Sequence, residues 1–340
     1  MKCFLWNFPF SFRGTLIIFL FSFFVSWEFS SAADDVSSSD PIFFGEIETL
    51  PLRIQPFLDI SLASIYMGSP DLGGYAYVPN SAPRAGLTFA YKRFKISYAS
   101  NLPLPPEEIS RRGNTTQSTF VLQTWFRSFA FELYSQAKKG LYAGNPLTEV
   151  DVHRAEIYSQ FPSGKIRNQG ITFYFSSRPE SFSFENSFAQ RHIQKKSGSG
   201  LALVPFFQNF EFESGNEVLP GKETNPIRQL PSMRKINFLN SGLMIGPGYH
   251  WVFDESGYYL ALQWVVGPGL QLQSWNELGK NDYSSQNFLA KTNINGFLGY
   301  NDKTKTFGLQ IFAEGIYSRI YSTDTYSTLI LPTIFYGQRF

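Results

Sequence analysis

Hydrophobic and polar residues alternate along much of the chain. In the segment 258–273, Tyr258 and Trp264 share one face, while Gln263 and Gln271 occupy the other. Successive side chains of a strand point to opposite faces, so this period of two predicts a strand. At about 16 residues it is longer than the usual globular strand of roughly 5–6 residues.

The same alternation predicts thirteen strands and no helix. After Ala33 no apolar run reaches 18 residues, which argues against a transmembrane helix. Bacterial single-chain barrels almost always have an even number of strands, so the assignment between 190 and 240 is in doubt. We favour twelve strands, with fourteen as the alternative, and the segments are 50–66, 84–91, 95–101, 117–126, 129–138, 166–176, 181–189, 198–213, 235–253, 257–274, 286–300, 305–321 and 327–340.

The problem lies with the segment 198–213. If both chain ends lie in the periplasm, the strand at 181–189 runs outward and the strand at 235–253 runs inward. The segment 198–213 is then either a strand outside the membrane or the partner of an unrecognised strand within 214–234.

Three further features favour a membrane barrel over a soluble sandwich. Apolar faces often end in aromatic residues, polar faces are rich in Gly, Ser, Asn and Gln, and short turns alternate with long connections. Outer-membrane barrels have aromatic girdles, polar interiors, short periplasmic turns and long outer loops. We therefore expect residues 50–340 to form a monomeric, transmembrane, up-and-down antiparallel β-barrel; a secreted soluble β-protein is an alternative. The expected turns lie at 92–93, 127–128, 178–180, 254–256 and 301–304, and the long connections near 67–83, 102–116, 139–165 and 275–285.

The first 33 residues have the features of a secretory signal peptide. Lys2 and Arg13 precede an apolar run at 14–27, and small residues follow it. The run is shorter than the roughly 20 residues of a membrane-spanning helix, which argues against an uncleaved anchor. We therefore expect a cleaved signal peptide at 1–33 and a periplasmic segment at 34–49, with the mature protein in a bacterial outer membrane.

Composition removes several classes of function. The 340 residues include 29 basic and 27 acidic ones, so no charge excess favours a nucleic-acid partner. Cys3 is the only cysteine and lies in the signal segment, which leaves no cysteine-based metal site. Aromatic residues make up 18% of the chain, and the alternation assigns many of them to a lipid-facing surface. We expect outer-membrane lipid as a partner, and no cofactor or metal.

The C-terminal strand ends on an aromatic residue. Ile334, Tyr336 and Phe340 share one face of this strand. A final strand with terminal phenylalanine resembles the C-terminal signature of bacterial outer-membrane proteins. This resemblance implies that Phe340 is part of a signal for the barrel assembly machinery.

A cluster of short motifs resembles an uncharacterised bacterial outer-membrane family, the domain-of-unknown-function family 4421. That family has a similar FSY…F-x-Q…Q-K-K-S-A-G-S stretch, although Ser197-Gly198-Ser199-Gly200 stands here in place of S-A-G-S. The hairpin 86–98 is also similar. The resemblance runs from about 50 to 340, implies an outer-membrane barrel and supplies no activity. The matching residues are Phe182, Ser183, Gln190, Gln194, Lys196, Ser197, Gly248, Tyr249, Pro268 and Gly269.

Two interpretations of the segment 192–199 stay open. His192 near Ser197 or Ser199 would be the base and nucleophile of a lipid hydrolase or acyltransferase. No third orienting group and no nucleophile-elbow motif is recognisable, so the alternative is a hydrogen-bonded plug or rim with glycine bends. The sequence favours a non-enzymatic barrel.

The inward faces of the predicted strands carry charges of both signs. One interpretation is a salt-bridged interior that fills the barrel; the other is a narrow polar channel without strong ion preference. His250 is expected to point inward near the periplasmic end, and His153 with Glu149 and Asp151 fits a solvated loop better than a metal site. The expected inward residues are Arg53, Asp59, Lys95, Glu132, Tyr134, Glu185, Lys291 and Glu314.

Overall fold

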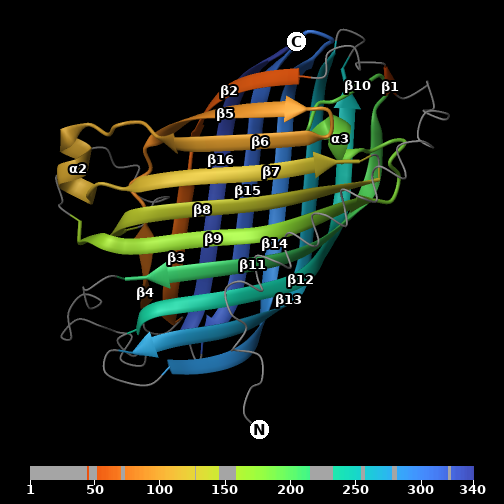
Figure 1. Cartoon of the computed structure of the whole chain (residues 1–340). Coiled ribbons are helices and arrows are strands. Elements are labelled where there is room, and N and C mark those ends of the chain that lie inside the picture. Colours follow the sequence, from red (N-terminus) through yellow and green to blue (C-terminus); the bar gives the residue numbers. More distant parts are fainter. Residues whose placement is uncertain are drawn as a thin grey trace, which may run out of the picture. The chain divides into compact units, whose positions relative to one another are not determined.

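Strands with alternating apolar and polar residues pair edge to edge into a closed antiparallel sheet (Figure 1). β16 pairs with both β15 and β2, and this closes the ring. Among the described residues the ring has twelve strands, which confirms the predicted antiparallel barrel. In pairing order they are β2 (Leu52–Ile60), β5 (Pro83–Tyr91), β6 (Phe94–Asn101), β7 (Thr116–Trp125), β8 (Phe129–Ala143), β9 (Gln160–Ser176), β11 (Gly198–Glu213), β12 (Met233–Val252), β13 (Tyr258–Glu277), β14 (Asp282–Asn301), β15 (Lys305–Ile320) and β16 (Thr323–Arg339).

The computed structural model describes most of the chain after residue 43. The expected signal peptide at 1–33, nearly all of the segment at 34–49 and the residues around His153 lie outside the described residues. Within the described part, neither helix is long and apolar enough to cross a membrane. The described ranges are 44–45, 52–69, 73–126, 128–144, 158–214, 233–253, 257–277, 282–320 and 323–340.

The barrel changes its strand number along its length. β5, β6 and β7 have only 9, 8 and 10 residues, whereas β12, β13 and β14 have 20 each. Along the part of the barrel past the ends of these short strands, β3 (Leu62–Ser69) pairs with β16. There β4 (Gly73–Val78) pairs with β3 and with β8. Two strands there replace the four strands β2, β5, β6 and β7, so the ring narrows from twelve strands to ten.

Both ends of the folded chain lie at the twelve-strand end. Leu52 and Phe340 exchange backbone hydrogen bonds there, and the tight turn at 92–93 and the turn after Asn301 lie at the same end. We call this the terminus end. The connection between β6 and β7 lies at the opposite end and contains α2 (Pro106–Arg112), a helix that the sequence did not predict.

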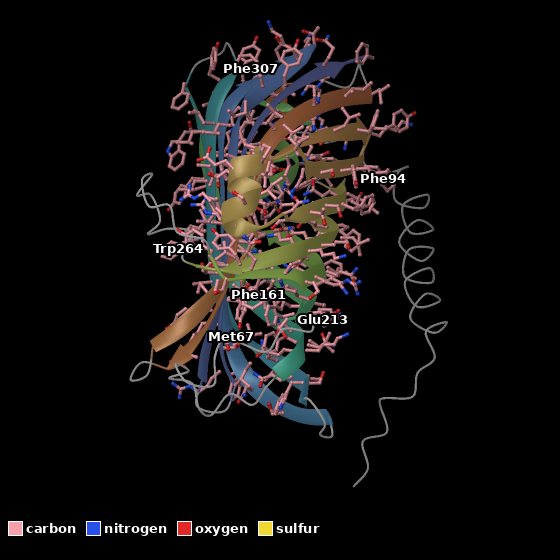
Figure 2. All side chains as sticks on the ribbon, turned by 90° about the vertical axis from the view of Figure 1, so that its left-hand side faces the viewer. Met67, Phe94, Phe161, Glu213, Trp264 and Phe307 are labelled. Atoms are coloured by element: carbon pink, nitrogen blue, oxygen red, sulfur yellow. The ribbon has the colours of Figure 1, made fainter. Side chains whose placement is uncertain are left out.

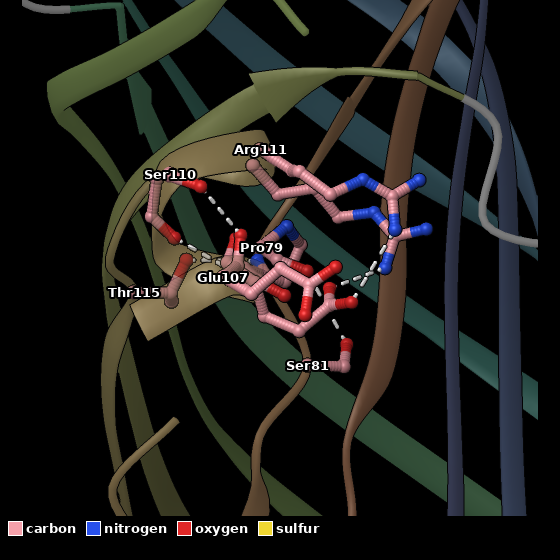
Figure 3. Close-up of polar contacts among 10 residues, drawn as sticks. Pro79, Ser81, Glu107, Ser110, Arg111 and Thr115 are labelled. Atoms are coloured by element: carbon pink, nitrogen blue, oxygen red, sulfur yellow. Dashed lines mark hydrogen bonds and ion pairs between the residues drawn. The ribbon is translucent and has the colours of Figure 1, made fainter. Parts of the chain in front are cut away.

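Hydrogen bonds attach the α2 segment to the barrel (Figure 3). The Asn80 side chain donates to the carbonyl oxygens of Glu108 (3.3 Å) and Gly113 (2.9 Å). The Asn80 backbone N–H donates to the Thr115 hydroxyl (2.8 Å), which donates to the Gly140 carbonyl (2.6 Å). The connection is therefore held at the edge of the opposite end by hydrogen bonds, and none of the residues of α2 is buried.

The predicted strand at 181–189 is wrong. This segment contains α3 (Phe184–Ser187), and every residue from Phe182 to Gln190 is buried. A wall strand buries only alternate residues, so continuous burial shows that the segment lies inside the barrel. The segment 198–213 is instead the wall strand β11 between β9 and β12, and this removes the odd strand.

Large apolar side chains cover the outer face of the barrel and many polar and charged side chains are buried inside, which is the reverse of a soluble sandwich. Figure 2 shows Trp264 and Phe94 pointing away from the wall, and Trp264 is 55% exposed. The interior also contains apolar clusters, so it is less hydrated than the glycine- and amide-rich inner faces suggest. One cluster at the opposite end includes Met67, Phe161 and Phe212, and another surrounds α3.

The turn after Asn301 depends on the charge of one carboxylate. Burial alone would raise the pKa of Asp302, but hydrogen bonds from the backbone N–H groups of Lys305 (2.8 Å) and Thr304 (2.6 Å), and from the Tyr300 hydroxyl (2.7 Å), lower it from 3.8 to about 2. A lowered pKa in the folded state stabilises the turn above about pH 4, and this stabilisation is lost as the pH falls toward 2.

We therefore expect amide hydrogen exchange at Thr304 and Lys305 to accelerate, relative to the intrinsic rate, between pH 4 and pH 2. In the Asp302→Asn variant, protection at these amides should not change over this range. Equal pH dependence in both proteins would show that Asp302 does not control the turn.

Candidate functional site in the barrel interior

The connection between β9 and β11, residues 177–197, folds into the barrel at the terminus end, and we call it the plug. Its Phe182, Phe184 and Phe188 are buried and pack on one another, with ring centroids 5.4–6.5 Å apart. They join an apolar cluster with side chains of the wall, including Phe206 and Phe297. The plug is therefore held chiefly by burial of aromatic area.

One glutamine joins the plug to the strands that close the ring. The Gln190 side-chain oxygen accepts hydrogen bonds from Arg53 of β2 (3.1 Å) and Thr306 of β15 (3.0 Å). The Gln190 backbone oxygen accepts from Arg339 of β16 (2.7 Å). Arg53 and Arg339 are partners across the β2–β16 pair. Gln190 has a φ of +58°, a left-handed conformation that is uncommon outside glycine.

The plug carries its own ion pair. Glu185, predicted on a strand, lies on α3 and pairs with Arg191, while the His192 Nε2 lies 3.7 Å from its Oε1. Burial would raise the pKa of Glu185, but the nearby His192 ring and the charge of Arg191 lower it below its ordinary value. The carboxylate therefore stays ionised although it is buried.

The candidate catalytic residues do not meet. Ser197 accepts a hydrogen bond from the Val252 backbone N–H (2.9 Å), and Ser199 is in β11 opposite Tyr249. Among the described residues, no hydrogen bond joins His192 to Ser197 or Ser199. The geometry therefore gives no support to the hydrolase interpretation.

A different serine–histidine contact occurs in the interior. The Ser187 hydroxyl lies 2.9 Å from His250 Nδ1, and the His250 ring stacks on Tyr259 with centroids 4.6 Å apart. His250 points inward near the terminus end, as its position in the alternation predicts. Both Ser187 and His250 are buried, at 0% and 2% exposure, so this pair fastens the plug to β12 and is closed to a substrate.

The plug and its contacts account for several family motif residues. A Cβ added to Gly248 would lie 2.2 Å from the Phe182 ring, so Phe182 packs where only glycine fits. Gln194 donates hydrogen bonds to the carbonyl oxygens of Ser181 (2.9 Å) and Lys196 (2.8 Å), which fix the return of the chain to β11. Ser183 is also buried in the plug. Tyr249 points outward and stacks on Trp251, while Pro268 and Gly269 lie in β13 outside the plug.

Two buried ion pairs join neighbouring strands on the inner face of the wall, β14 to β15 and β2 to β5. Lys291 Nζ lies 2.8 Å from Glu314 Oε2 and donates to Gln208 (3.2 Å), and it lies 4.5 Å from the centroid of the Phe206 ring. The second pair is bidentate and joins Arg84 to Asp59 at 2.5 and 2.8 Å.

Arg84 is an inward residue outside the set predicted from the sequence. Arg84 lies on β5 at the same parity as the inward Thr88, so the alternation contained this signal. The Arg84 Nη1 also donates to Thr119 (2.6 Å).

A cavity of about 170 Å³ lies in the interior, bordered by Phe184 and Phe188 of the plug and by Glu314. Lys95, Gln123 and Glu132 line it side by side on β6, β7 and β8. Gln123 donates a hydrogen bond to Glu132. Of the predicted inward residues, Lys95, Glu132, Tyr134 and Glu314 line this cavity, whereas Arg53 contacts the plug.

The profile of a family described as a domain of unknown function, DUF4421, matches residues 71–340. The chain belongs to the DUF4421 family. This match confirms the family resemblance predicted from the motifs. The DUF4421 domain covers all of the ring except β2, and it includes the whole plug. Comparison with curated protein sequences gives no match.

Solved structures of outer-membrane proteins resemble the DUF4421 chain at low identity. The outer membrane protease OmpT from Escherichia coli is 7% identical, with a TM-score of 0.35, covering 87% of this chain and 100% of OmpT. The toluene transporter TodX from Pseudomonas putida is 8% identical, with a TM-score of 0.26 and coverage of 85% and 90%. The attachment invasion locus protein Ail of Yersinia pestis is 7% identical, with a TM-score of 0.22 and coverage of 83% and 98%.

Proposed function

We propose that this DUF4421 protein is a monomeric outer-membrane barrel whose interior is closed by its plug, so that it is a structural membrane barrel and no open pore. The observation that carries the proposal is the inversion of its two faces. Large apolar side chains such as Phe288 (80% exposed) cover the outside, while charged side chains such as Lys291 (1% exposed) are buried inside. In water such a surface would be an aggregation site; in lipid it is the favourable arrangement.

The outward apolar band has a distinct border at each end. At the terminus end, outward aromatic residues include Tyr91, Trp251, Tyr258 and Tyr336, and such aromatic rings mark the membrane interface in known barrels. Toward the opposite end on β9, β11 and β12, outward residues form ion pairs. These are Lys165–Glu213 (3.5 Å), Arg167–Glu211 (3.5 Å) and Lys235–Glu211 (3.1 Å).

Packing on both sides of the cavity supports a closed interior. The plug fills the terminus end, and the cluster around Met67 and Phe212 fills the opposite end. Between them, Gln208 of β11 forms hydrogen bonds with Lys291 of β14 (3.2 Å) and Glu314 of β15 (3.2 Å), and neither strand is a neighbour of β11. The salt-bridged interpretation of the inward charges is therefore favoured over the channel interpretation.

The membrane orientation follows from the connections. We propose that the terminus end faces the periplasm, because short turns and chain ends lie there in outer-membrane barrels. The same proposal includes export by a cleaved signal peptide at 1–33. It also includes recognition of Phe340 by the barrel assembly machinery.

Membrane fractionation and bilayer recordings test the proposal. We expect the protein in the outer-membrane fraction, with gel migration that changes on heating, because folded barrels resist detergent until heated. Purified folded protein in a planar bilayer should give no steady conductance. Recovery in the soluble periplasmic fraction would favour the secreted β-protein, and regular channel openings would favour the narrow channel.

A further inference from the structure

The cavity beneath the plug has the chemistry of a ligand site. Eight asparagine and glutamine side chains line it, together with seven serine, threonine and tyrosine hydroxyls. Its wall also carries the rings of Trp125, Phe184 and Phe188. Small-molecule sites combine apolar or aromatic walls with a few convergent polar groups in this way.

Several polar atoms of the cavity wall have no hydrogen-bond partner within the described part of the chain. They are the Trp125 Nε1, the Gln263 Nε2, the Gln55 Oε1 and the Asn293 Oδ1. These side chains are between 0% and 6% exposed. A buried polar atom without a partner costs about 1–3 kcal/mol, so donors and acceptors that converge on one space call for an occupant that bonds them.

The charges of the cavity wall favour a neutral occupant. Glu314 is paired with Lys291 at 2.8 Å. The remaining charged residues of the wall are one cation, Lys95, and one anion, Glu132, separated by a single strand. Neither sign is in excess.

The volume limits the occupant to one ring. A cavity of about 150 Å³ holds one benzene molecule, so 170 Å³ has room for a single six-membered ring. A pyranose ring presents hydroxyl groups around its rim and C–H bonds on its faces, which match amide side chains and aromatic rings respectively. We propose that this cavity binds one neutral monosaccharide, with the plug as one wall of the site.

This inference rests on the plugged barrel of the proposed function but not on its location in a membrane. A failure of sugar binding and a failure of the membrane location are therefore distinguishable. Binding is measured on the full protein in a polyoxyethylene detergent, because detergents with sugar headgroups would compete. We expect glucose, galactose or mannose to change the tryptophan fluorescence saturably, and maltose to bind at least tenfold more weakly because a second ring has no room.

Matched variants locate the binding. Asn293→Leu removes the amide at nearly constant size and should weaken binding about tenfold, the loss expected for one hydrogen bond in a buried site. Trp125→Phe should abolish the fluorescence change, whereas Trp264→Phe on the outer face should retain it. Absence of binding by all three monosaccharides, with the barrel folded, would overturn the proposal and indicate a cavity holding ordered water only. Binding of phenol but of no sugar would overturn it in favour of an apolar-ring site.

Discussion

Replacing Lys291 with methionine is expected to lower the free energy of unfolding by about 3–5 kcal/mol. Lys291 is 1% exposed and is the ion-pair partner of Glu314, which is also buried. Methionine fills similar space but leaves the carboxylate of Glu314 without its cation, and an uncompensated buried charge is the costly outcome. Urea unfolding in detergent micelles, followed by the heat-dependent gel migration, measures the change.

Two comparisons separate charge from packing. The double variant Lys291→Met/Glu314→Leu should recover most of the loss, because a buried ion pair can be replaced by apolar residues of similar size at little cost. Lys235→Met breaks the pair with Glu211 on the outer face, where Lys235 is 49% exposed, and should cost less than about 1 kcal/mol. If the double variant were no more stable than the single one, lost packing and not charge would explain the effect.

The contact between Phe182 and Gly248 should show strong coupling. Phe182→Ala removes a fully buried ring and is expected to cost about 3–5 kcal/mol. Gly248→Ala places a methyl group 2.2 Å from that ring and is expected to cost about 1–3 kcal/mol by overpacking. The double variant should cost less than the sum, because the new methyl group enters the space left by the ring.

Trypsin reports whether the plug leaves the interior. Gly248→Ala should make the plug susceptible to cleavage at Arg178, Arg191 or Lys195, whereas the wild type should resist it. Gly296→Ala is the matched control, because its added methyl group would have its nearest neighbour at 3.9 Å. Additive costs in the double variant, with an uncleaved plug in Gly248→Ala, would contradict a direct contact.

The wall of the barrel was predictable from the sequence because its determinants are local. Within the apolar band, outward residues such as Trp264 are apolar, and neighbours such as Gln263 face inward and are polar, so the alternation identifies the strand. The predicted count of thirteen strands then indicated that one assignment was wrong, because such barrels almost always have an even number of strands. The predicted strand at 50–66 covers β2 and most of β3 as one strand. The strand β4 lies in the predicted connection 67–83 and was missed, because its pairing with β8 joins residues far apart in the chain.

The plug was not predictable in this way. Phe182, Ser183 and Phe184 alternate as a strand would, although all three are buried. The later pair Phe188 and Ala189 breaks the alternation, and this was the available local signal. The partner of Phe182 is Gly248, and nothing in a single sequence marks that contact. The cavity likewise gathers side chains from strands throughout the barrel, so its position follows only from the closed ring.

The hydrogen bonds of Gln190 have a consequence for biogenesis. Arg53 and Arg339 become neighbours only when the last strand meets the first, and Gln190 is 137 and 149 residues away from them. Before the plug docks, the Arg53 side chain lacks the Gln190 acceptor, whereas Arg339 keeps its hydrogen bond to the Asn301 side-chain oxygen (2.5 Å). The full set of Gln190 hydrogen bonds therefore exists only when the ring is closed and the plug is docked, so the two steps support each other. In the proposed setting, a nascent barrel with an open seam would lack this anchor for its plug.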